Sequence, residues 1–274
     1  MRAPTDDMLV SFSAADAFTG CERRYFYEKV MQEKQPETAP LVVGNVYHSA
    51  IAEMLRNRLL TPADAVASAA GPAAEALEAV RVDPDALMDE MEQNLTRLDE
   101  EVLAYVVPAS CEDGGAFVEK KFEDTRLGYR GVIDVVSMTV PVTKDGTVIG
   151  WKPGKCVLDW KSLTSDRRRS DRDAKFSPQL GLYALAVQGA TAAGFVEIPR
   201  DVTKPIKVRM SEYTGDTLAN MDIWLRAIRA TMISRGTDIV NYRMTERSNG
   251  LCSPSWCPFW FKCFPSQQEG ASVK

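Results

Sequence analysis

Two acidic residues and a lysine form the pattern with the clearest chemistry in this sequence. Asp159 and Lys161 follow the apolar run Cys156-Val157-Leu158, and the two-residue period of a strand places both side chains on one face. Asp134 follows Gly131-Val132-Ile133, 25 positions before Asp159, so antiparallel pairing would bring the two carboxylates to one end of a sheet. Paired carboxylates bind hard cations such as Mg²⁺ or Mn²⁺, and a nearby lysine can orient water or stabilise developing negative charge. Because an Asp-x-Lys triplet also occurs by chance on solvated strands, the pattern needs support from other residues.

Further candidate residues precede and follow this triplet. His48, the only histidine of the chain, ends the segment Gly44-Asn45-Val46-Tyr47-His48, and Glu119 ends Phe117-Val118-Glu119. Gln179 and Tyr183 lie four residues apart in a segment that Ser177-Pro178 predicts to be a helix. A lone histidine is often structural, and the strand of Glu119 also carries other charged residues, so the order of the whole set is the stronger signal.

Four cysteines at the two ends of the chain form a second candidate metal site: Cys21, Cys252, Cys257 and Cys263. Four thiolates bind either zinc or a 4Fe-4S cluster, and scattered structural thiols are the remaining alternative. The aromatic residues near the late cysteines favour the cluster, because they would exclude water and oxygen. Such a site would join the N-terminal and C-terminal segments, so its metal would contribute directly to the folding free energy.

Composition describes an ordinary folded protein. The chain has 274 residues, 45% of them hydrophobic and 26% charged, which suits a single large core. The net charge of −5 argues against non-specific coating of nucleic acid, so any nucleic-acid contact must be local. The densest basic segment is interleaved with aspartates and is either a solvated loop or a phosphate-contacting loop: Arg167, Arg168, Arg169, Arg172 and Lys175.

The chain shows no feature of an exported or membrane protein. Its first residues carry no apolar signal region, and no stretch approaches the roughly 20 apolar residues that a bilayer requires. We therefore expect a cytoplasmic protein without a membrane partner. It also lacks the GxxxxGK phosphate loop of an attached ATP-driven motor.

The hydrophobic pattern predicts mixed α/β structure. We expect a helix over residues 13–31 with Ser13 as its N-cap and Cys21 near its middle, and a helix over 44–60 with His48 in its first turn or two. Two or three helices should follow, over about 61–107. Strands are predicted at 116–123, 129–140 and 155–162, a helix at 178–189, strands at 193–199 and 205–210, and a helix at about 217–235.

Taken together, the ordered motifs resemble the PD-(D/E)XK nucleases of the RecB-like class. The matching features are a GxxxH motif of Gly44 and His48 on a helix, a GxxD motif of Gly131 and Asp134 on a strand, a DxK motif of Asp159 and Lys161 on a strand, and a QxxxY motif of Gln179 and Tyr183 on a helix. One cysteine before these motifs and three after them is the layout of RecB-like exonucleases with a 4Fe-4S cluster, including the CRISPR-associated exonucleases and their phage relatives. This chain has four residues between Cys252 and Cys257, where the family commonly has two.

The resemblance implies a restriction-endonuclease-like fold, with a mixed central sheet flanked by helices, a helical insertion and the cysteine site. It implies one domain over 1–274, divided into N-terminal helices (1–60), the insertion (61–112), the nuclease core (113–240) and a cysteine-rich segment (241–274). The Mg²⁺ or Mn²⁺ ligands would be His48, Asp134, Asp159 and the Leu158 backbone carbonyl, with Glu119 as an accessory residue. Lys161 would serve the attacking water, and Gln179 and Tyr183 would shape the DNA side.

The implied activity is metal-dependent exonucleolytic hydrolysis of single-stranded DNA in recombination, repair or CRISPR-type processing. The implied partners are single-stranded DNA, further copies of the chain, or recombination and CRISPR-adaptation proteins, in the host cytoplasm if the protein is viral. The alternative function is a catalytically silent DNA-binding or scaffold module. The intact set of Asp134, Asp159 and Lys161 argues against that alternative.

Overall fold

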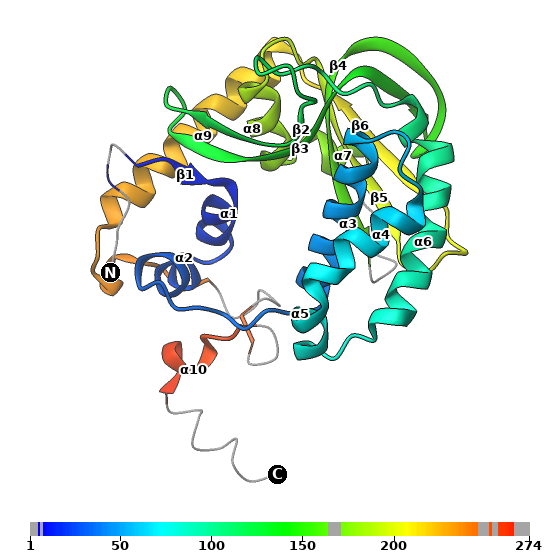
Figure 1. The fold of residues 1–274 in the computed structure, drawn as a ribbon. Coiled ribbons are helices and arrows are strands. Elements are labelled where there is room, and N and C mark those ends of the chain that lie inside the picture. Colours follow the sequence, from blue (N-terminus) through cyan, green and yellow to red (C-terminus); the bar gives the residue numbers. More distant parts are fainter. Residues whose placement is uncertain (1–4, 6–7, 164–170, 246–251, 254–256, 266–274) are drawn as a thin grey trace. The chain divides into compact units, whose positions relative to one another are not determined.

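The computed structural model describes residues 5, 8–163, 171–245, 252–253 and 257–265 (Figure 1). These residues form two compact units. Unit 1 comprises Met1–Pro36, Glu123–Gly131 and Ile223–Lys274, and unit 2 comprises Glu37–Phe122 and Val132–Asp222. Within the described residues, no helix is both long enough and apolar enough to span a membrane.

A mixed sheet forms the centre of unit 2. Strands β3 and β4 are antiparallel, β4 and β5 are parallel, and β5 and β6 are antiparallel, while β2 pairs with β3. The strand bounds are β2 (Val118–Asp124), β3 (Tyr129–Lys144), β4 (Thr147–Leu163), β5 (Ala192–Pro199) and β6 (Lys207–Glu212). Seven of the eight β5 residues are buried, because helices cover both faces of the sheet.

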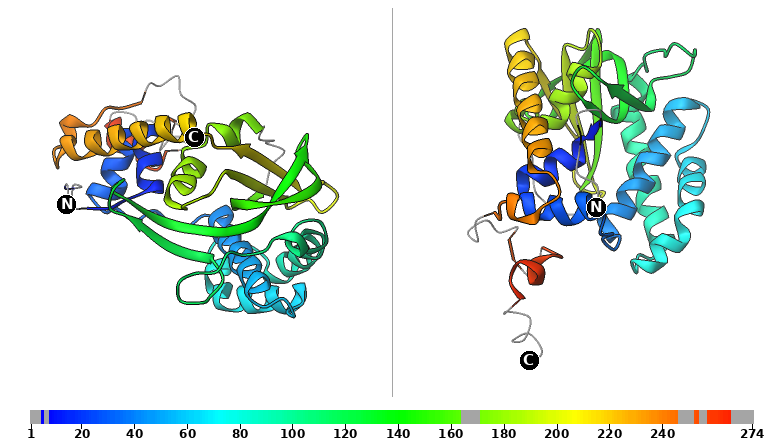
Figure 2. Two further views of the ribbon diagram at one scale, coloured as in Figure 1. Left: turned by 90° about the horizontal axis from the view of Figure 1, so that it is seen from above. Right: turned by 90° about the vertical axis from the view of Figure 1, so that its left-hand side faces the viewer.

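Helices flank this sheet on both sides, as the view from above shows (Figure 2). Helices α3, α4 and α6 lie on one face and α8 on the other. The core between the first group and the sheet contains Ile51 and Leu95 from the helices and Leu158 and Val196 from the strands. The helix bounds in unit 2 are α3 (Ala39–Arg56), α4 (Pro62–Ala70), α5 (Ala74–Ala79), α6 (Pro84–Glu101), α7 (Asp171–Lys175) and α8 (Pro178–Ala186). The predicted α/β fold with a mixed, helix-flanked sheet is confirmed.

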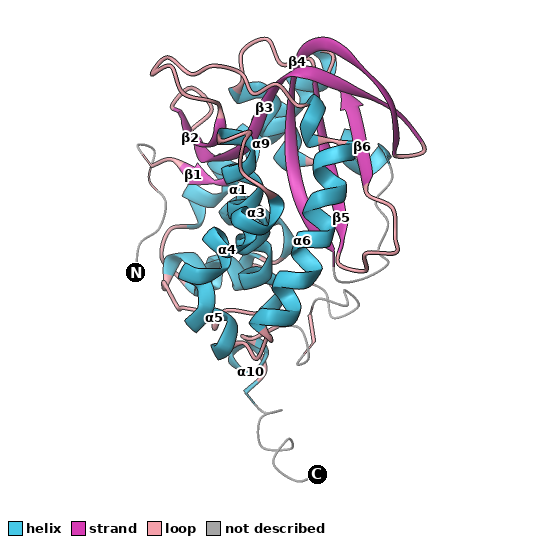
Figure 3. Ribbon diagram, turned by 45° about the vertical axis from the view of Figure 1, so that its right-hand side comes forward, coloured by secondary structure: helices cyan, strands magenta, loops and turns pink. Residues whose placement is uncertain are grey.

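Strands β3 and β4 form a longer hairpin than the sequence predicted (Figure 3). The turn lies at Asp145 and Gly146, which both have positive φ. Pro153 and Gly154 fall between the strands predicted at 129–140 and 155–162, but they lie inside β4, where Pro153 pairs with Thr139 next to a register shift. That shift accommodates a residue that cannot donate a ladder hydrogen bond. Asp134 consequently lies within β3 and not at its end.

Gly194 of β5 permits close packing against β6. A Cβ atom there would lie 2.2 Å from Met210 Sδ and 2.7 Å from the Arg209 carbonyl oxygen. Because backbone cannot yield as a flexible side chain can, we expect Gly194→Ala to lower the free energy of unfolding by about 2 kcal/mol. Urea denaturation measures this change. The matched control is Gly150→Ala in β4, where a Cβ atom would meet no heavy atom within 4 Å; equal midpoints for the two variants would contradict the expectation.

Unit 1 contains both ends of the chain. Its elements are β1 (Val10–Ser11), α1 (Phe12–Gly20), α2 (Glu22–Tyr25), a π-helical turn (Phe26–Val30), a large part of α9 (Gly215–Arg235), a 3₁₀ turn (Ile239–Asn241) and α10 (Trp260–Cys263). β1 pairs in parallel with the first residues of β3. Tyr242 packs against Phe26 and Tyr25, with ring centres 5.0 Å and 6.1 Å apart. This aromatic cluster joins segments that are more than 200 residues apart.

Two helices near the N-terminus differ from the prediction. The predicted helix 13–31 is divided at Cys21, which has an extended backbone with φ −162°, and Ser11, not Ser13, is the N-cap of α1. Cys21 therefore lies at a helix junction and not in a helix middle. Helix α3 begins at Ala39 with Pro40 in its first turn, where a missing N–H costs nothing. His48 consequently lies near the middle of α3, beyond the first two turns.

Candidate functional site

The pairing of β3 with β4 places the predicted acidic residues side by side. Val135 pairs with Leu158, so the next residues along the two strands are Asp134 and Asp159. The Trp160 backbone N–H donates a 2.8 Å hydrogen bond to Asp134 Oδ2, which fixes that carboxylate. Both carboxylates are buried, so their position is set by the sheet and not by solvent.

Asp159 is held by two further predicted residues. Lys161 Nζ lies 2.5 Å from Asp159 Oδ2, and Gln179 Nε2 donates a 2.8 Å hydrogen bond to Oδ1. The same Gln179 nitrogen donates to the Tyr183 hydroxyl at 3.1 Å. The Phe122 ring meets the Tyr183 ring edge to face at 5.9 Å. Ser177 caps α8 by accepting from the Leu180 N–H, and this cap places Gln179 in the first turn.

His48 reaches the acidic pair from α3. Its Nδ1 atom lies 3.4 Å from both Asp134 Oδ2 and Glu119 Oε1. The neighbouring Tyr47 is fully buried and donates a hydrogen bond to Glu90 at 3.0 Å, and Arg200 holds Glu90 through both carboxylate oxygens. This network fixes the rotation of α3, because Tyr47 and His48 are consecutive residues of one helix. The sequence analysis did not find Glu90 or Arg200; their opposite charges lie 110 positions apart.

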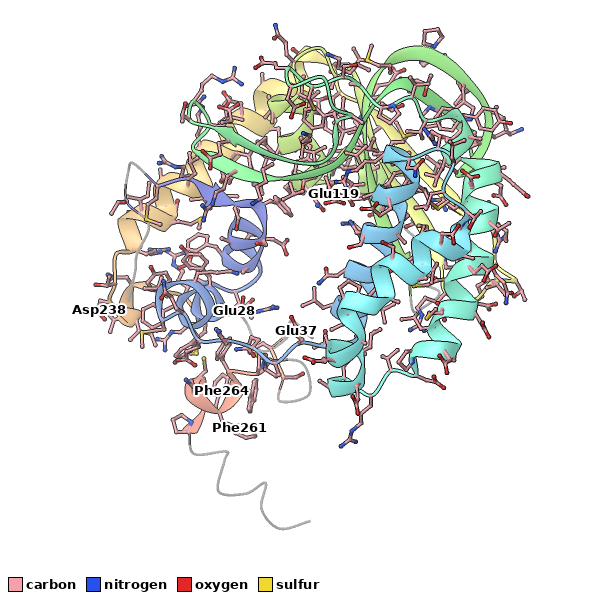
Figure 4. The ribbon with its side chains drawn as sticks, viewed as in Figure 1. Glu28, Glu37, Glu119, Asp238, Phe261 and Phe264 are labelled. Carbon is pink, nitrogen blue, oxygen red and sulfur yellow. The ribbon has the colours of Figure 1, made fainter. Side chains whose placement is uncertain are left out.

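Glu119 has an unusual backbone. Its φ is +50°, a left-handed value that costs a non-glycine residue about 1 kcal/mol or more. Its Oε1 atom is buried and accepts no hydrogen bond within the described part of the chain; the contact to His48 is too long for a good one. Figure 4 shows Glu119 on β2. A strained backbone that carries an unsatisfied buried carboxylate oxygen is typical of a binding site.

The electrostatics of the site follow from this crowding of carboxylates. Burial lowers the pKa of His48, but the carboxylates of Asp134, Glu119 and Asp159 outweigh it and raise that pKa to about 10. Burial, followed by the charge of Asp134, raises the pKa of Asp159 to about 6, against the opposing effect of Lys161. The pKa of the Tyr183 hydroxyl is raised by burial and by the same carboxylates. The site thus carries an excess of negative charge, which attracts cations.

The donor set fits a divalent cation. One ligand atom from each of His48, Glu119 and Asp134 lies within 4.8 Å of the others. Carboxylate oxygens suit Mg²⁺ and Mn²⁺, and imidazole nitrogen suits transition metals more than Mg²⁺. The unsatisfied Glu119 oxygen is the structural observation that supports a ligand here. Leu158 lies directly beside the site in β4, and the role of its carbonyl stays a prediction.

A groove of 660 Å³ adjoins the site, although Asp134 and Asp159 are not among the residues that line it. His48, Glu119 and Lys161 line it, together with polar residues of α3 that the sequence analysis did not select, Asn45, Ser49 and Arg56. The signal of Asn45 and Arg56 was available in the sequence, because they are three and eight positions from His48 and so share its helix face. Ser49, the next residue, lies about 100° around the helix.

The four predicted cysteines line one cavity of 440 Å³ in unit 1. Burial raises the pKa of Cys257 and Cys263, and the proximity of Cys21 raises both further. Phe259 and Trp260 are buried beside them, and Phe264, labelled in Figure 4, also lines the cavity with its ring centre 4.3 Å from that of Trp260. Phe261 is not among the residues that line it. Trp256 lies outside the described residues. The cavity gathers the four thiols, all of which the structure describes, but no three of their Sγ atoms lie within 4.8 Å of one another, so the binding of a metal or cluster by these cysteines stays a prediction.

The predicted basic loop is described only in part. Arg167, Arg168 and Arg169 lie outside the described residues, and the side chain of Arg172 does too. Lys175 ends α7 and is exposed, with its Nζ 5.7 Å from the centre of the Phe176 ring. The contact of this loop with phosphate stays a prediction.

Comparisons with known proteins agree with this geometry. Residues 9–264 match the family model of the PD-(D/E)XK nuclease superfamily. A crystal structure from Eubacterium rectale, described as a candidate exonuclease, superimposes with a TM-score of 0.50, covering 85% of this chain and 83% of its own, at 10% sequence identity. That identity is low enough that the likeness concerns the fold alone. A search of curated proteins gave no match.

Proposed function

Since the chain belongs to the PD-(D/E)XK nuclease superfamily, we propose that it is a metal-dependent exonuclease that hydrolyses single-stranded DNA from an end. One observation carries this proposal. His48 and Glu119 meet Asp134 at a distance suited to one cation, while Lys161 contacts the adjacent Asp159. The acidic residues bind metal, and the lysine supplies positive charge where a phosphate would react.

The residues of the site have separate tasks in this proposal. A bound Mg²⁺ or Mn²⁺ would neutralise charge on the phosphate and lower the pKa of the attacking water. His48, Asp134, Asp159 and the Leu158 carbonyl would hold it, with Glu119 as an accessory ligand. Lys161 Nζ would donate to the water or to a phosphate oxygen, stabilising the charge that develops in the transition state. Gln179 holds Asp159 in place, and Tyr183 holds Gln179.

The direct test is degradation of single strands labelled at the 5′ end or at the 3′ end. With Mn²⁺ or Mg²⁺ we expect release of short products from one end, and with EDTA none. Comparing the two labels gives the polarity. Absence of cleavage with every divalent ion would overturn the proposal and favour the silent scaffold.

We further propose a 4Fe-4S cluster on Cys21, Cys252, Cys257 and Cys263, with zinc as the alternative occupant. The support is the shared cavity of the four thiols and the buried aromatic residues beside it. The cluster would be structural, joining segments from both ends of the chain. Visible colour and the iron and zinc contents of anaerobically purified protein distinguish the two metals.

Glu119→Gln is expected to weaken Mn²⁺ binding about tenfold, because it removes the negative charge of one of the three carboxylates that attract the cation. The expected result is a tenfold higher Mn²⁺ concentration for half-maximal cleavage, with little change at saturation. Glu123→Gln is the matched control, because Glu123 is an exposed acid of the same strand. An equal shift in both variants would contradict a ligand role for Glu119.

A further inference from the structure

The groove around His48 extends along α3 in both directions. At one end Gly44 faces β4, since a Cβ atom there would lie 3.6 Å from Ser162 Oγ. At the other end Arg56 lines the groove and its Nη2 donates a 3.1 Å hydrogen bond to the Val118 carbonyl of β2. The groove is therefore bounded by a helix on one side and by strands on the other, with the acidic site between its ends.

The length of this groove follows from the spacing of the residues that line it along α3. His48 and Arg56 are eight residues apart, which corresponds to about 12 Å along the helix axis. Successive nucleotides of a stacked strand rise about 3.4 Å each, so Arg56 lies about three to four nucleotides from His48. Asn45 and Ser49 are exposed on the same stretch of helix, on either side of His48.

We propose that this groove is the path of a single polynucleotide strand and that Arg56 binds a backbone phosphate about three nucleotides from the bond that is cleaved. The assignment rests on the proposed nuclease function and gives it a substrate contact outside the metal site. Asn45 and Ser49 contact the sugar and phosphate atoms nearer to His48. Arginine suits this position because its planar guanidinium pairs with two phosphate oxygens at once.

Arg56 has donors available for a phosphate. Its guanidinium carries five N–H groups, of which one serves Val118 and another faces Glu53, with Nη1 3.5 Å from Oε1. The Arg56 and Glu53 side chains are 44% and 45% exposed, so a phosphate can reach the guanidinium. Glu53 competes with that phosphate for the Arg56 guanidinium. Replacement of Glu53 by a neutral residue should therefore strengthen strand binding.

The burial of the site favours a single strand over a duplex. The side chains of Asp134 and Asp159 are 8% and 1% exposed, so a reacting phosphate must enter the groove to reach them. A flexible single strand can bend to bring one phosphate into the groove, whereas the backbone of a duplex is stiff over the length of such a site. The net charge of −5 leaves local contacts such as Arg56 to provide the affinity.

The dependence of KM on strand length distinguishes a contact between Arg56 and the strand from a general loss of activity. We expect Arg56→Gln in the full chain to raise KM about tenfold for a single strand of about 12 nucleotides, with kcat within about twofold. For a strand of about 3 nucleotides, too short to reach Arg56, KM should not change. In an Asp159→Asn background, fluorescence anisotropy with labelled oligothymidylate should show a salt-dependence slope smaller by about 0.7, the value of one phosphate contact.

Arg97→Gln is the matched control. Arg97 is also a helical arginine that faces a glutamate of its own helix and donates to backbone carbonyls, but it lies outside this groove. Its loss should leave both KM values and the salt slope unchanged. Glu53→Gln should lower KM for the long strand, and it gives a second result if Arg56→Gln fails to fold.

Equal KM changes for long and short strands, an unchanged salt slope, or a higher KM in Glu53→Gln would each overturn the assignment of Arg56. Equal cleavage of duplex would overturn the single-strand path. Absence of cleavage by the unmodified protein would instead overturn the proposed function itself.

Discussion

Asp159→Asn is expected to lower the rate of strand cleavage by about 10³-fold, which corresponds to about 4 kcal/mol of lost transition-state stabilisation. Asparagine has the same shape but no charge, so it removes a cation ligand from a buried position without leaving a cavity. It also places an amide where Asp159 now meets two donors, Lys161 Nζ and Gln179 Nε2. The measurement is the release of labelled nucleotides at saturating Mn²⁺.

Asp201→Asn is the control for the loss of one negative charge. Asp201 lies in the same unit, is exposed, and bonds only to Thr203 and Lys204 in the described structure. The Asp201→Asn protein should cleave the strand at the rate of the unmodified protein. Circular dichroism of both variants checks that they are folded. An Asp159→Asn protein with more than a tenth of the normal rate would show that this carboxylate is not essential.

Cys257→Ser is expected to produce the largest change in stability. If four thiolates hold a metal or cluster, loss of one ligand removes much of a binding free energy of about 10 kcal/mol, and this energy is also folding energy. We expect the thermal midpoint to fall by about 10 °C or more, since about 1 kcal/mol corresponds to 2–4 °C in a chain of this size. Metal content and visible absorbance should fall with it.

Cys111→Ser is the matched control, because Cys111 is a partly exposed thiol that does not line the cysteine cavity. Its metal content and thermal midpoint should equal those of the unmodified protein. If Cys257→Ser retained its metal and its midpoint, the four cysteines would be ordinary structural thiols.

The positions of the strands and of the carboxylates were predictable because they depend on local patterns. The apolar run before Asp159, the Ser177 cap and the turn residues Asp145 and Gly146 each act within a few residues. Element ends were less predictable. The helix expected to begin at residue 44 begins at Ala39 with Pro40 in its first turn, and Pro153 lies inside a strand at a register shift. Both depend on where a missing N–H can be tolerated, which the pairing of distant segments decides.

The residues of the site were likewise predictable where local patterns place them, and not where contacts between distant segments do. Asp134, Asp159 and Lys161 were predicted to lie together from their spacing on paired strands, and Gln179 was placed near them by the family resemblance; the structure brings the four together. The contact of Glu119 with His48 depends on a left-handed backbone that no residue type in the segment indicates. The Glu90 to Arg200 pair that fixes α3 likewise requires knowledge of which helix lies on which strand.

Unit 1 combines segments that are far apart in the chain, and this arrangement has a consequence for the synthesis of the protein. Its cysteines come from chain segments that begin and end the sequence, so Cys21 leaves the ribosome 242 residues before Cys263. At about 5–20 residues per second, that interval lasts roughly 10–50 s. Until Cys263 is made the set of four cysteines is incomplete, whereas Tyr183, the last residue of the acidic site along the chain, is made 80 residues before Cys263. A nascent chain could therefore assemble the acidic site before its cysteine set is complete.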